Sequence, residues 1–206
     1  GSQLPMNRGG GGFTWQILQD DTKGYVSLHK VVTGIDKGDI ILTKSFVTKK
    51  CRNPLEFQNL YIKEASNLFM KFLKKKNKKV KINSKKQNEN LSSYWPRLNT
   101  QIHGWINWDW TAQEISKFIK GFDDPYVGAH TTINNKIIYL KNVTLIKNTI
   151  FHPFQSGIIY RKNSKGIFVC AKNGALFLKG FFNKNNSNFD KKYLKLGDRF
   201  FTPSKY

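Results

Sequence analysis

The sequence predicts an α/β protein in two parts, with a mixed α/β part first and a small β domain of the OB-barrel type second. Three observations predict it. Two β-rich runs followed by one long amphipathic helix open the chain, a Lys/Asn-rich stretch interrupts it, and short strands with Gly/Asn turns fill the rest. The 206 residues suffice for a buried core, and 39% hydrophobic content argues against disorder.

The first part begins with a short helix and two strands. Apolar residues at helical spacing after the glycine run predict a helix over 12–20. The alternating run "YVSLHKVV" predicts a strand over 25–32, and "GDIILTKSFV" predicts a second one over 39–47. We expect both strands to belong to a parallel sheet, joined by a turn over 33–38.

A long helix follows the second strand. Pro54 suits its first turn, and apolar residues at helical spacing continue to about residue 75. These residues are Leu55, Tyr61, Ile62, Ala65, Leu68, Phe69 and Phe72.

The stretch "KKKNKKVKINSKKQNEN" is polar and poor in core-forming residues. It predicts a domain boundary, with a first domain over 1–76, a basic linker over 77–92 and a second domain over 93–206. Two interpretations of the stretch stay open: a solvated helix end with a loop, or an arm that tethers an anionic partner.

The second part opens with an aromatic-rich stretch and a helix start. Thr111 with Glu114 three residues later forms a capping box, and the residues after it have a helical apolar face. From residue 129 onward, about five short strands separated by Gly/Asn turns predict an OB-like β-barrel.

Charge and cysteine content limit the class of protein. The formal net charge of +22 favours contact with a polyanion such as nucleic acid, although the Lys/Asn/Ile/Phe usage of an AT-rich genome would give the same excess. No apolar run is long enough for a membrane span, and no secretory signal is visible. Cys51 and Cys170 are far apart and lack a CxxC partner, which argues against zinc and favours a cytoplasmic protein with free thiols.

Three blocks in order carry a family resemblance: "SQLPMNRGGGGFTWQIL", "YVSLHKVVTGIDKGDIIL", and "WPRL" with "GWINWDWTAQEISKFIKGFDDPYVGAHTT". Together they resemble the N10-formyltetrahydrofolate-dependent formyltransferases, which include methionyl-tRNA formyltransferase and enzymes that formylate nucleotide-linked amino sugars. The resemblance covers nearly the whole chain. It implies the C-terminal part of a Rossmann-like formyltransferase domain over 1–76, followed by the family's C-terminal OB-like domain.

The first block resembles the family signature N-x-H-x-S-L-L-P-x-x-R-G-x-x-P-x-x-W. Six residues match it, and Gly12 stands where the family has Pro. The matching residues are Ser2, Leu4, Pro5, Arg8, Gly9 and Trp15. The family's Asn and His would fall immediately before Gly1, so we expect a fragment without formyltransferase activity on its own.

The second block resembles a strand followed by x-x-x-D-x-G-x-I, in which Asp36, Gly38 and Ile40 match. The resemblance implies that Asp36 is the third member of a catalytic Asn/His/Asp set, in which it orients the His and helps to accept the proton of the attacking amine. The local string alone fits a turn acid that bonds its own backbone. His29, in the strand before this turn, is interpreted as a structural strand residue.

The resemblance also implies the ligands. N10-formyltetrahydrofolate would donate the formyl group without a metal, and the expected donor contacts are Leu4, Pro5, Val32, Gly34 and Ile35. The expected acceptor contacts are Arg8, Arg97 and Tyr126.

The acceptor itself stays open between initiator methionyl-tRNA, which the charge favours, and a nucleotide-linked amino sugar, which "SLHK" favours. Two alternatives to catalysis also stay open: a basic OB-like module that binds RNA, and an inactive family member.

Overall fold

The computed structural model describes residues 2–203, which divide into two compact units between Leu98 and Asn99. The division lies after the end of the predicted linker, 77–92, because Lys85, Gln87 and Glu89 of that stretch bond residues of the first unit.

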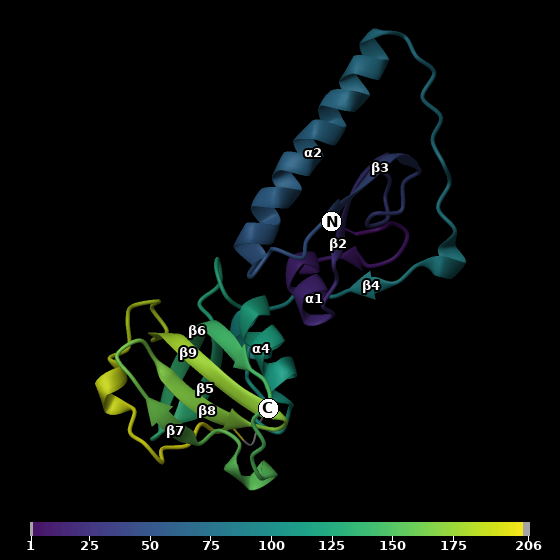
Figure 1. Ribbon diagram of the computed structural model, residues 1–206. Coiled ribbons are helices and arrows are strands. Elements are labelled where there is room, and N and C mark those ends of the chain that lie inside the picture. Colours follow the sequence, from purple (N-terminus) through teal and green to yellow (C-terminus); the bar gives the residue numbers. More distant parts are fainter. Residues whose placement is uncertain (1, 204–206) are drawn as a thin grey trace. The chain divides into compact units, whose positions relative to one another are not determined.

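The first unit contains two small sheets (Figure 1). Strand β1 (Arg8–Gly9) pairs in parallel with β4 (Tyr94–Trp95), and β2 (Lys23–His29) pairs with β3 (Ile40–Val47). The second pairing is antiparallel, so the expectation of one parallel sheet for these strands is wrong. A connection of only ten or so residues allows a hairpin, whereas a parallel pair needs a longer crossover.

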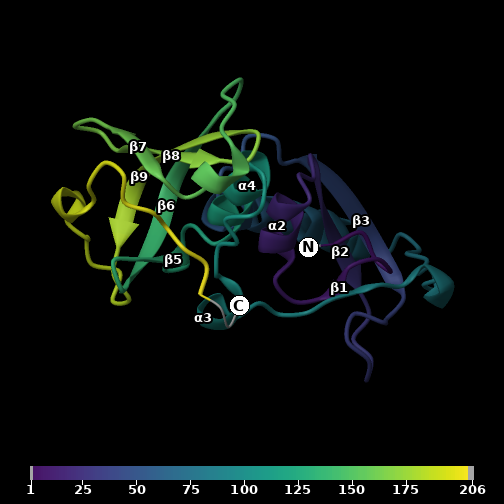
Figure 2. The same cartoon turned by 90° about the horizontal axis from the view of Figure 1, so that it is seen from below.

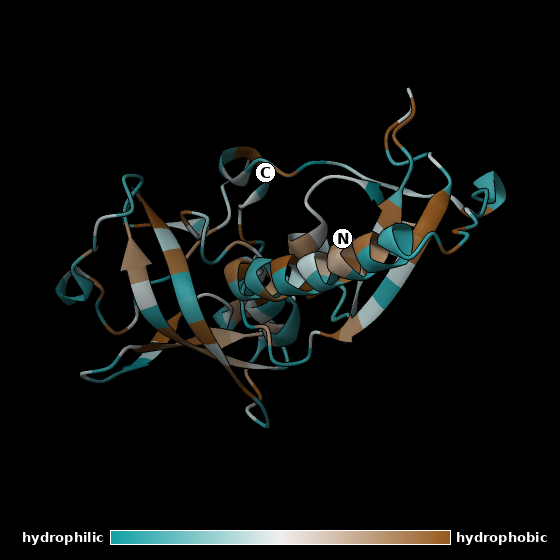
Figure 3. Ribbon diagram, turned by 90° about the horizontal axis from the view of Figure 1, so that it is seen from above, coloured by the Kyte–Doolittle hydropathy of each residue, from teal (hydrophilic) through white to brown (hydrophobic). Residues whose placement is uncertain are grey.

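One long helix packs on the hairpin, and a short helix packs on the long one. Helix α1 (Gly12–Leu18) and helix α2 (Pro54–Asn77) agree with the expected helices, and the Asn53 side chain caps α2 by accepting a hydrogen bond from the Glu56 amide. Phe57 of α2 is 1% exposed, and its ring lies 5.1 Å from that of Phe13 and 6.0 Å from that of Phe46. Hydrophobic and hydrophilic residues are interspersed along the length of α2 (Figure 3).

The chain then returns along the first unit as an extended segment from the end of α2 to β4 (Figure 1). Lys85 and Ile40 exchange both backbone hydrogen bonds, a short 3-10 helix η1 follows over Glu89–Leu91, and β4 completes the pairing with β1. Residues 85–95 are therefore held by backbone pairing to the first unit, and this segment is called the return segment below.

The second unit is a five-stranded antiparallel sheet with one main helix on it. Its strands lie in the order β5-β6-β9-β8-β7. Their bounds are β5 (Ala129–Ile133), β6 (Lys136–Ile146), β7 (Ile159–Lys162), β8 (Ile167–Ala171) and β9 (Gly174–Phe182). The short helix α3 (Thr100–His103) precedes α4 (Ala112–Gly121), and 3-10 turns occur at Pro153–Gln155 and Lys191–Tyr193. The predicted capping box at Thr111 and Glu114 is confirmed by both of its hydrogen bonds.

The end of the chain contacts both edges of this sheet, and Figure 2 shows it in yellow beside the strands. Phe201 exchanges two backbone hydrogen bonds with Thr132 of edge strand β5. Phe200 donates to Gly157, and Ile159 of the other edge strand donates to Asp198. These bonds satisfy backbone groups on edges that would otherwise be open.

Within residues 2–203, no helix is both long and apolar enough to cross a membrane.

Candidate functional site

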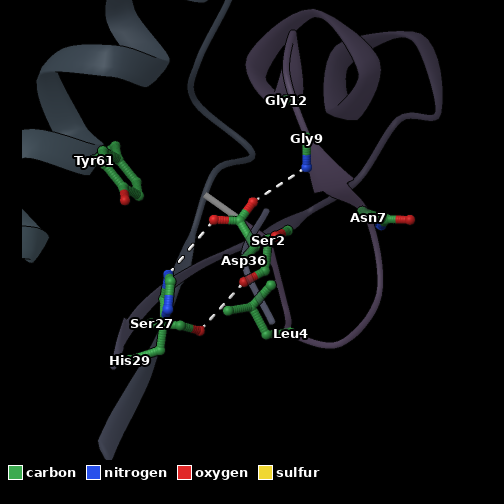
Figure 4. Close-up of a pocket in the computed structure, with 9 residues that line it drawn as sticks. All are labelled: Ser2, Leu4, Asn7, Gly9, Gly12, Ser27, His29, Asp36 and Tyr61. Atoms are coloured by element: carbon green, nitrogen blue, oxygen red, sulfur yellow. Dashed lines mark hydrogen bonds and ion pairs between the residues drawn. The ribbon is translucent and has the colours of Figure 1, made fainter. Parts of the chain in front are cut away.

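A polar pocket of about 220 Å³ lies in the first unit, between the N-terminal segment, the β2–β3 hairpin and α2 (Figure 4). Its lining residues are Ser2, Leu4, Asn7, Gly9, Gly12, Ser27, His29, Asp36 and Tyr61. Asp36, at the turn between β2 and β3, is the only carboxylate among them.

Asp36 has a left-handed backbone conformation with φ of 54°. Aspartate tolerates this conformation better than most residues because its short polar side chain can bond locally. Its Oδ2 accepts a hydrogen bond of 3.1 Å from the Gly9 amide, and its Oδ1 lies 3.5 Å from Nε2 of His29 (Figure 4). The side chain is 35% exposed, so it is held from two sides and still open to the pocket.

The backbone at Gly9 admits no other residue without a shift. Its φ is 99°, and a Cβ atom would lie 2.5 Å from the Trp95 carbonyl oxygen and 2.4 Å from the Tyr94 ring. Glycine thus allows β1 to pair closely with β4 while its N–H points at Asp36.

His29 stands at the end of β2, where the register with β3 shifts. Its Nδ1 lies 2.9 Å from the Lys30 carbonyl oxygen, which can only accept a hydrogen bond, so Nδ1 carries a proton there. The second nitrogen, Nε2, faces the Asp36 carboxylate. The ring therefore lies between the Lys30 carbonyl oxygen and the Asp36 carboxylate.

Two hydroxyl groups complete the polar lining. Ser27, also on β2, donates from Oγ to the Ser2 carbonyl at 3.3 Å (Figure 4). Burial, and secondly the charge of Asp36, raises the pKa of Tyr61 on α2. The Tyr61 hydroxyl therefore stays protonated at neutral pH and can donate a hydrogen bond.

Of the residues expected to contact the formyl donor, Leu4 lines this pocket and the others lie beside it or in the Asp36 turn. Leu4 is 9% exposed, with Pro5 following through a cis peptide bond. Val32 and Ile35 are 50% and 64% exposed in the turn that carries Asp36, with Gly34 between them.

The expected acceptor contacts are not gathered at the pocket. The Arg8 side chain is 6% exposed and bonds Glu89 and Gln87, so it is not presented to a ligand. Arg97 lies against Gly10 in the first unit, and Tyr126 belongs to the second unit.

Several pocket residues were not among the predicted site residues: Asn7, Ser27, His29 and Tyr61. For His29 a signal existed, because it precedes the Asp36 turn and the hairpin brings it back to that turn. Ser27 follows from the same alternation, since residues two apart share a strand face. Nothing in the local sequence indicates that Tyr61 reaches the pocket.

The arrangement suits a step in which a proton is removed from a nucleophile. A carboxylate held by an N–H on one oxygen and by an imidazole on the other can orient a polar hydrogen and receive a proton. Among the described residues, no group of three His, Cys, Asp or Glu side chains is close enough to hold a metal ion.

The fold and the pocket define an α/β protein with a carboxylate–imidazole site on a hairpin turn. Known proteins share parts of its sequence and its fold. Residues 99–188 match the family model "Formyl transferase, C-terminal domain". A methionyl-tRNA formyltransferase from Rickettsia massiliae is 30% identical over 158 residues, which are 77% of this chain and 50% of that protein. The chain thus spans about half the length of the curated relatives it matches.

Solved structures share the fold. One is the N-formyltransferase from Helicobacter canadensis, solved with folinic acid and dTDP-3-aminofucose. It superposes on this chain with a TM-score of 0.65 at 22% sequence identity, and the aligned part is 87% of this chain and 63% of that protein. HypX from Aquifex aeolicus with tetrahydrofolic acid has a TM-score of 0.66 at 14% identity, over 86% of this chain and 30% of its own.

These comparisons confirm the resemblance that the sequence indicates. The chain is similar to the C-terminal part of the formyltransferase family, and residues 99–188 match the model of that family's C-terminal domain.

Proposed function

We propose that the gene product containing this chain transfers a formyl group from N10-formyltetrahydrofolate to a primary amine. The main support for this proposal is the position of Asp36 in a polar pocket of the first unit. There its carboxylate accepts a hydrogen bond from the Gly9 amide and faces His29. The similarity to methionyl-tRNA formyltransferases and the fold shared with proteins solved with folates support the same reaction.

In this reaction the amine nitrogen attacks the formyl carbon, and the carbon's bond to N10 of the folate breaks. The amine loses one proton and the departing N10 gains one, so the overall transfer is balanced. Asp36 is assigned to orient the amine and take up its proton, directly or through a water molecule. His29 faces the same carboxylate, with its Nε2 3.5 Å from Oδ1 of Asp36.

The donor side is assigned to the wall formed by Leu4 and Pro5 and to the exposed turn that contains Val32, Gly34 and Ile35. Apolar side chains at one rim of a polar pocket suit a flat ring system with polar edges. Arg97 and Tyr126 remain candidate acceptor contacts. Arg8 is reassigned, because its guanidinium is buried in contacts within the protein.

Two acceptors have specific support. Methionyl-tRNA is favoured by the curated relatives and by the net charge of +22, which attracts a polyanion. A nucleotide-linked amino sugar is favoured by the fold shared with the Helicobacter canadensis enzyme, whose structure holds such a sugar. We rank methionyl-tRNA first because its support comes from sequence identity.

We further propose that the second unit has an OB-like architecture. We also propose that the first unit is the C-terminal part of a Rossmann-like catalytic domain. The contacts of residues 198–201 with both edge strands support the first assignment, since a barrel leaves no open edge. The pocket at Asp36 supports the second.

The experiment is a transfer assay on the whole gene product, with N10-formyltetrahydrofolate and each acceptor in turn. We expect formylated product with one acceptor and a loss of about 10²-fold or more in kcat for Asp36→Asn. Asn tolerates a left-handed backbone and keeps an oxygen for the Gly9 amide, so the fold should persist. No product with either acceptor, together with salt-sensitive RNA binding, would favour the RNA-binding module instead.

A further inference from the structure

The backbone of the Asp36 turn is held by one buried side chain from the return segment. Gln87 is only 6% exposed, and its side chain lies against the turn. Its Nε2 donates to the Asp36 carbonyl oxygen at 2.7 Å and to the Gly38 carbonyl oxygen at 2.6 Å. Both hydrogens of the amide group are thereby used on one turn, which is the full donor capacity of this side chain.

The orientation of this amide is fixed by a charge. Its Oε1 accepts a hydrogen bond of 2.8 Å from Nη2 of Arg8. The opposite orientation would place the NH2 group against the guanidinium and the oxygen against two carbonyl oxygens. A cation on one side and two acceptors on the other therefore select a single arrangement.

Arg8 is itself held in place. Its Nη1 and Nη2 bond the two carboxylate oxygens of Glu89 at 2.9 and 2.8 Å. The hydrogen bond to Glu89 raises the pKa of Arg8, and the same bond lowers the pKa of Glu89. Residues 87 and 89 of the return segment thus fix one guanidinium from two sides.

The contacts close into a ring around Asp36. The Gly9 amide, adjacent to Arg8 in β1, donates to the Asp36 carboxylate. The Arg8 side chain reaches the Asp36 carbonyl through Gln87. Strand β1 therefore holds the carboxylate directly and the backbone of the same residue through the amide.

We propose that Gln87 is a positioning residue for Asp36, with Arg8 and Glu89 setting its orientation. Gln87 does not itself line the pocket, and it acts by fixing the left-handed turn on which the Asp36 carboxylate stands. The return segment is in this way part of the site, although it contributes no side chain to the pocket. The expected change in kcat rests on the proposed formyl transfer. The expected change in the amide NMR signals of the turn rests on the geometry alone.

The test compares Gln87→Glu with Gln58→Glu, the same substitution on an exposed face of α2. Gln87→Glu keeps an oxygen for Arg8 and places a carboxylate against the two carbonyl oxygens. Both proteins are made as the full chain and as the whole gene product. Thermal unfolding, the amide NMR signals of Gly9 and Gly38, and kcat and KM of formyl transfer are measured.

We expect Gln87→Glu to shift the Gly9 and Gly38 amide signals and to lower kcat by about 10²-fold, with KM for the donor little changed. Gln58→Glu should change none of these. Unchanged amide signals and unchanged kcat in a folded Gln87→Glu protein would overturn the proposal.

Two further arms keep the result interpretable. If Gln87→Glu does not fold, Gln87→Met, which is similar in volume and lacks the amide, is measured in the same way and judged by the same signals. If the wild type shows no formyl transfer, the proposed function fails. The amide signals then still decide whether Gln87 holds the Asp36 turn.

Discussion

Nε2 of His29 lies 3.5 Å from Oδ1 of Asp36, although the two residues stand on opposite sides of a turn. The antiparallel hairpin of β2 and β3 creates this approach, because the chain reverses between them. A parallel arrangement of the two strands would have required a crossover connection and separated the residues. The topology that sequence analysis missed is thus the cause of the pairing at the site.

The first prediction concerns the imidazole of His29. In His29→Gln the side-chain NH2 group can take the place of Nε2, whereas in His29→Asn it can take the place of Nδ1. If the contact with Asp36 matters for the proposed transfer, kcat should fall least in His29→Gln and by about 10- to 10²-fold in His29→Asn. Steady-state kinetics of the whole gene product measures this order.

The reverse order would show that the Nδ1 contact with the Lys30 carbonyl is the one that matters. In that case His29 would be a structural residue of the strand, as the sequence alone suggested. Thermal unfolding of both variants separates loss of fold from loss of activity.

The second prediction concerns Gly9. Gly9→Ala adds a methyl group that meets the Trp95 carbonyl oxygen at 2.5 Å and must also adopt a φ of 99°. We expect a loss of about 2 kcal/mol or more in the free energy of unfolding and a displaced N–H toward Asp36. Denaturant unfolding measures the first effect and the proposed transfer reaction the second.

Gly197 provides the matched control, since its φ is 87° and a Cβ atom there would meet nothing within 4 Å. Gly197→Ala therefore carries the backbone strain without the collision. Equal losses in the two variants would show that the contact with β4 is unimportant.

The third prediction concerns the core of the first unit. Phe57 is 1% exposed and lies between the rings of Phe13 and Phe46. Phe57→Ala should cost about 3–5 kcal/mol of unfolding free energy, through lost burial and the cavity left behind. Ile62→Ala, on the same helix at a position 52% exposed, should cost much less. Denaturant unfolding of the two variants measures the difference, and similar losses would contradict the assigned core.

The local structure was predictable where the deciding interactions are close in sequence. Asn53 and Pro54 begin α2, and Thr111 with Glu114 begins α4, because each cap bonds residues within the next turn. Asp36 was also identified in advance, through the motif around it. Its catalytic role stays a prediction.

The long-range part of the site was not predictable in the same way. Arg8 and Gln87 are separated by 79 residues, and no local pattern shows that they bond. The Lys/Asn-rich composition around Gln87 predicted a solvated linker. It did not reveal that one amide and one carboxylate in that stretch would be tied to β1.

The last prediction concerns His130 in the second unit. The side chain is packed against the rings of Trp105 and Tyr139, and burial lowers its pKa from 6.5 to about 4. Between these two pH values the unfolded chain binds a proton that the folded unit does not bind. The free energy of unfolding should therefore fall as the pH is lowered from about 6.5 to about 4, by on the order of 2–3 kcal/mol from this residue.

His130→Phe removes the titrating group and should flatten this part of the pH profile relative to the wild type. His152→Asn is the control, because His152 caps a short surface turn and Asn can accept the same hydrogen bond from the Phe154 amide. Chemical unfolding at several pH values from neutral to acid, followed by fluorescence, gives the three profiles. A wild-type slope that persists in His130→Phe would assign the acid sensitivity to other groups, since the buried imidazole would then be absent while the effect remained.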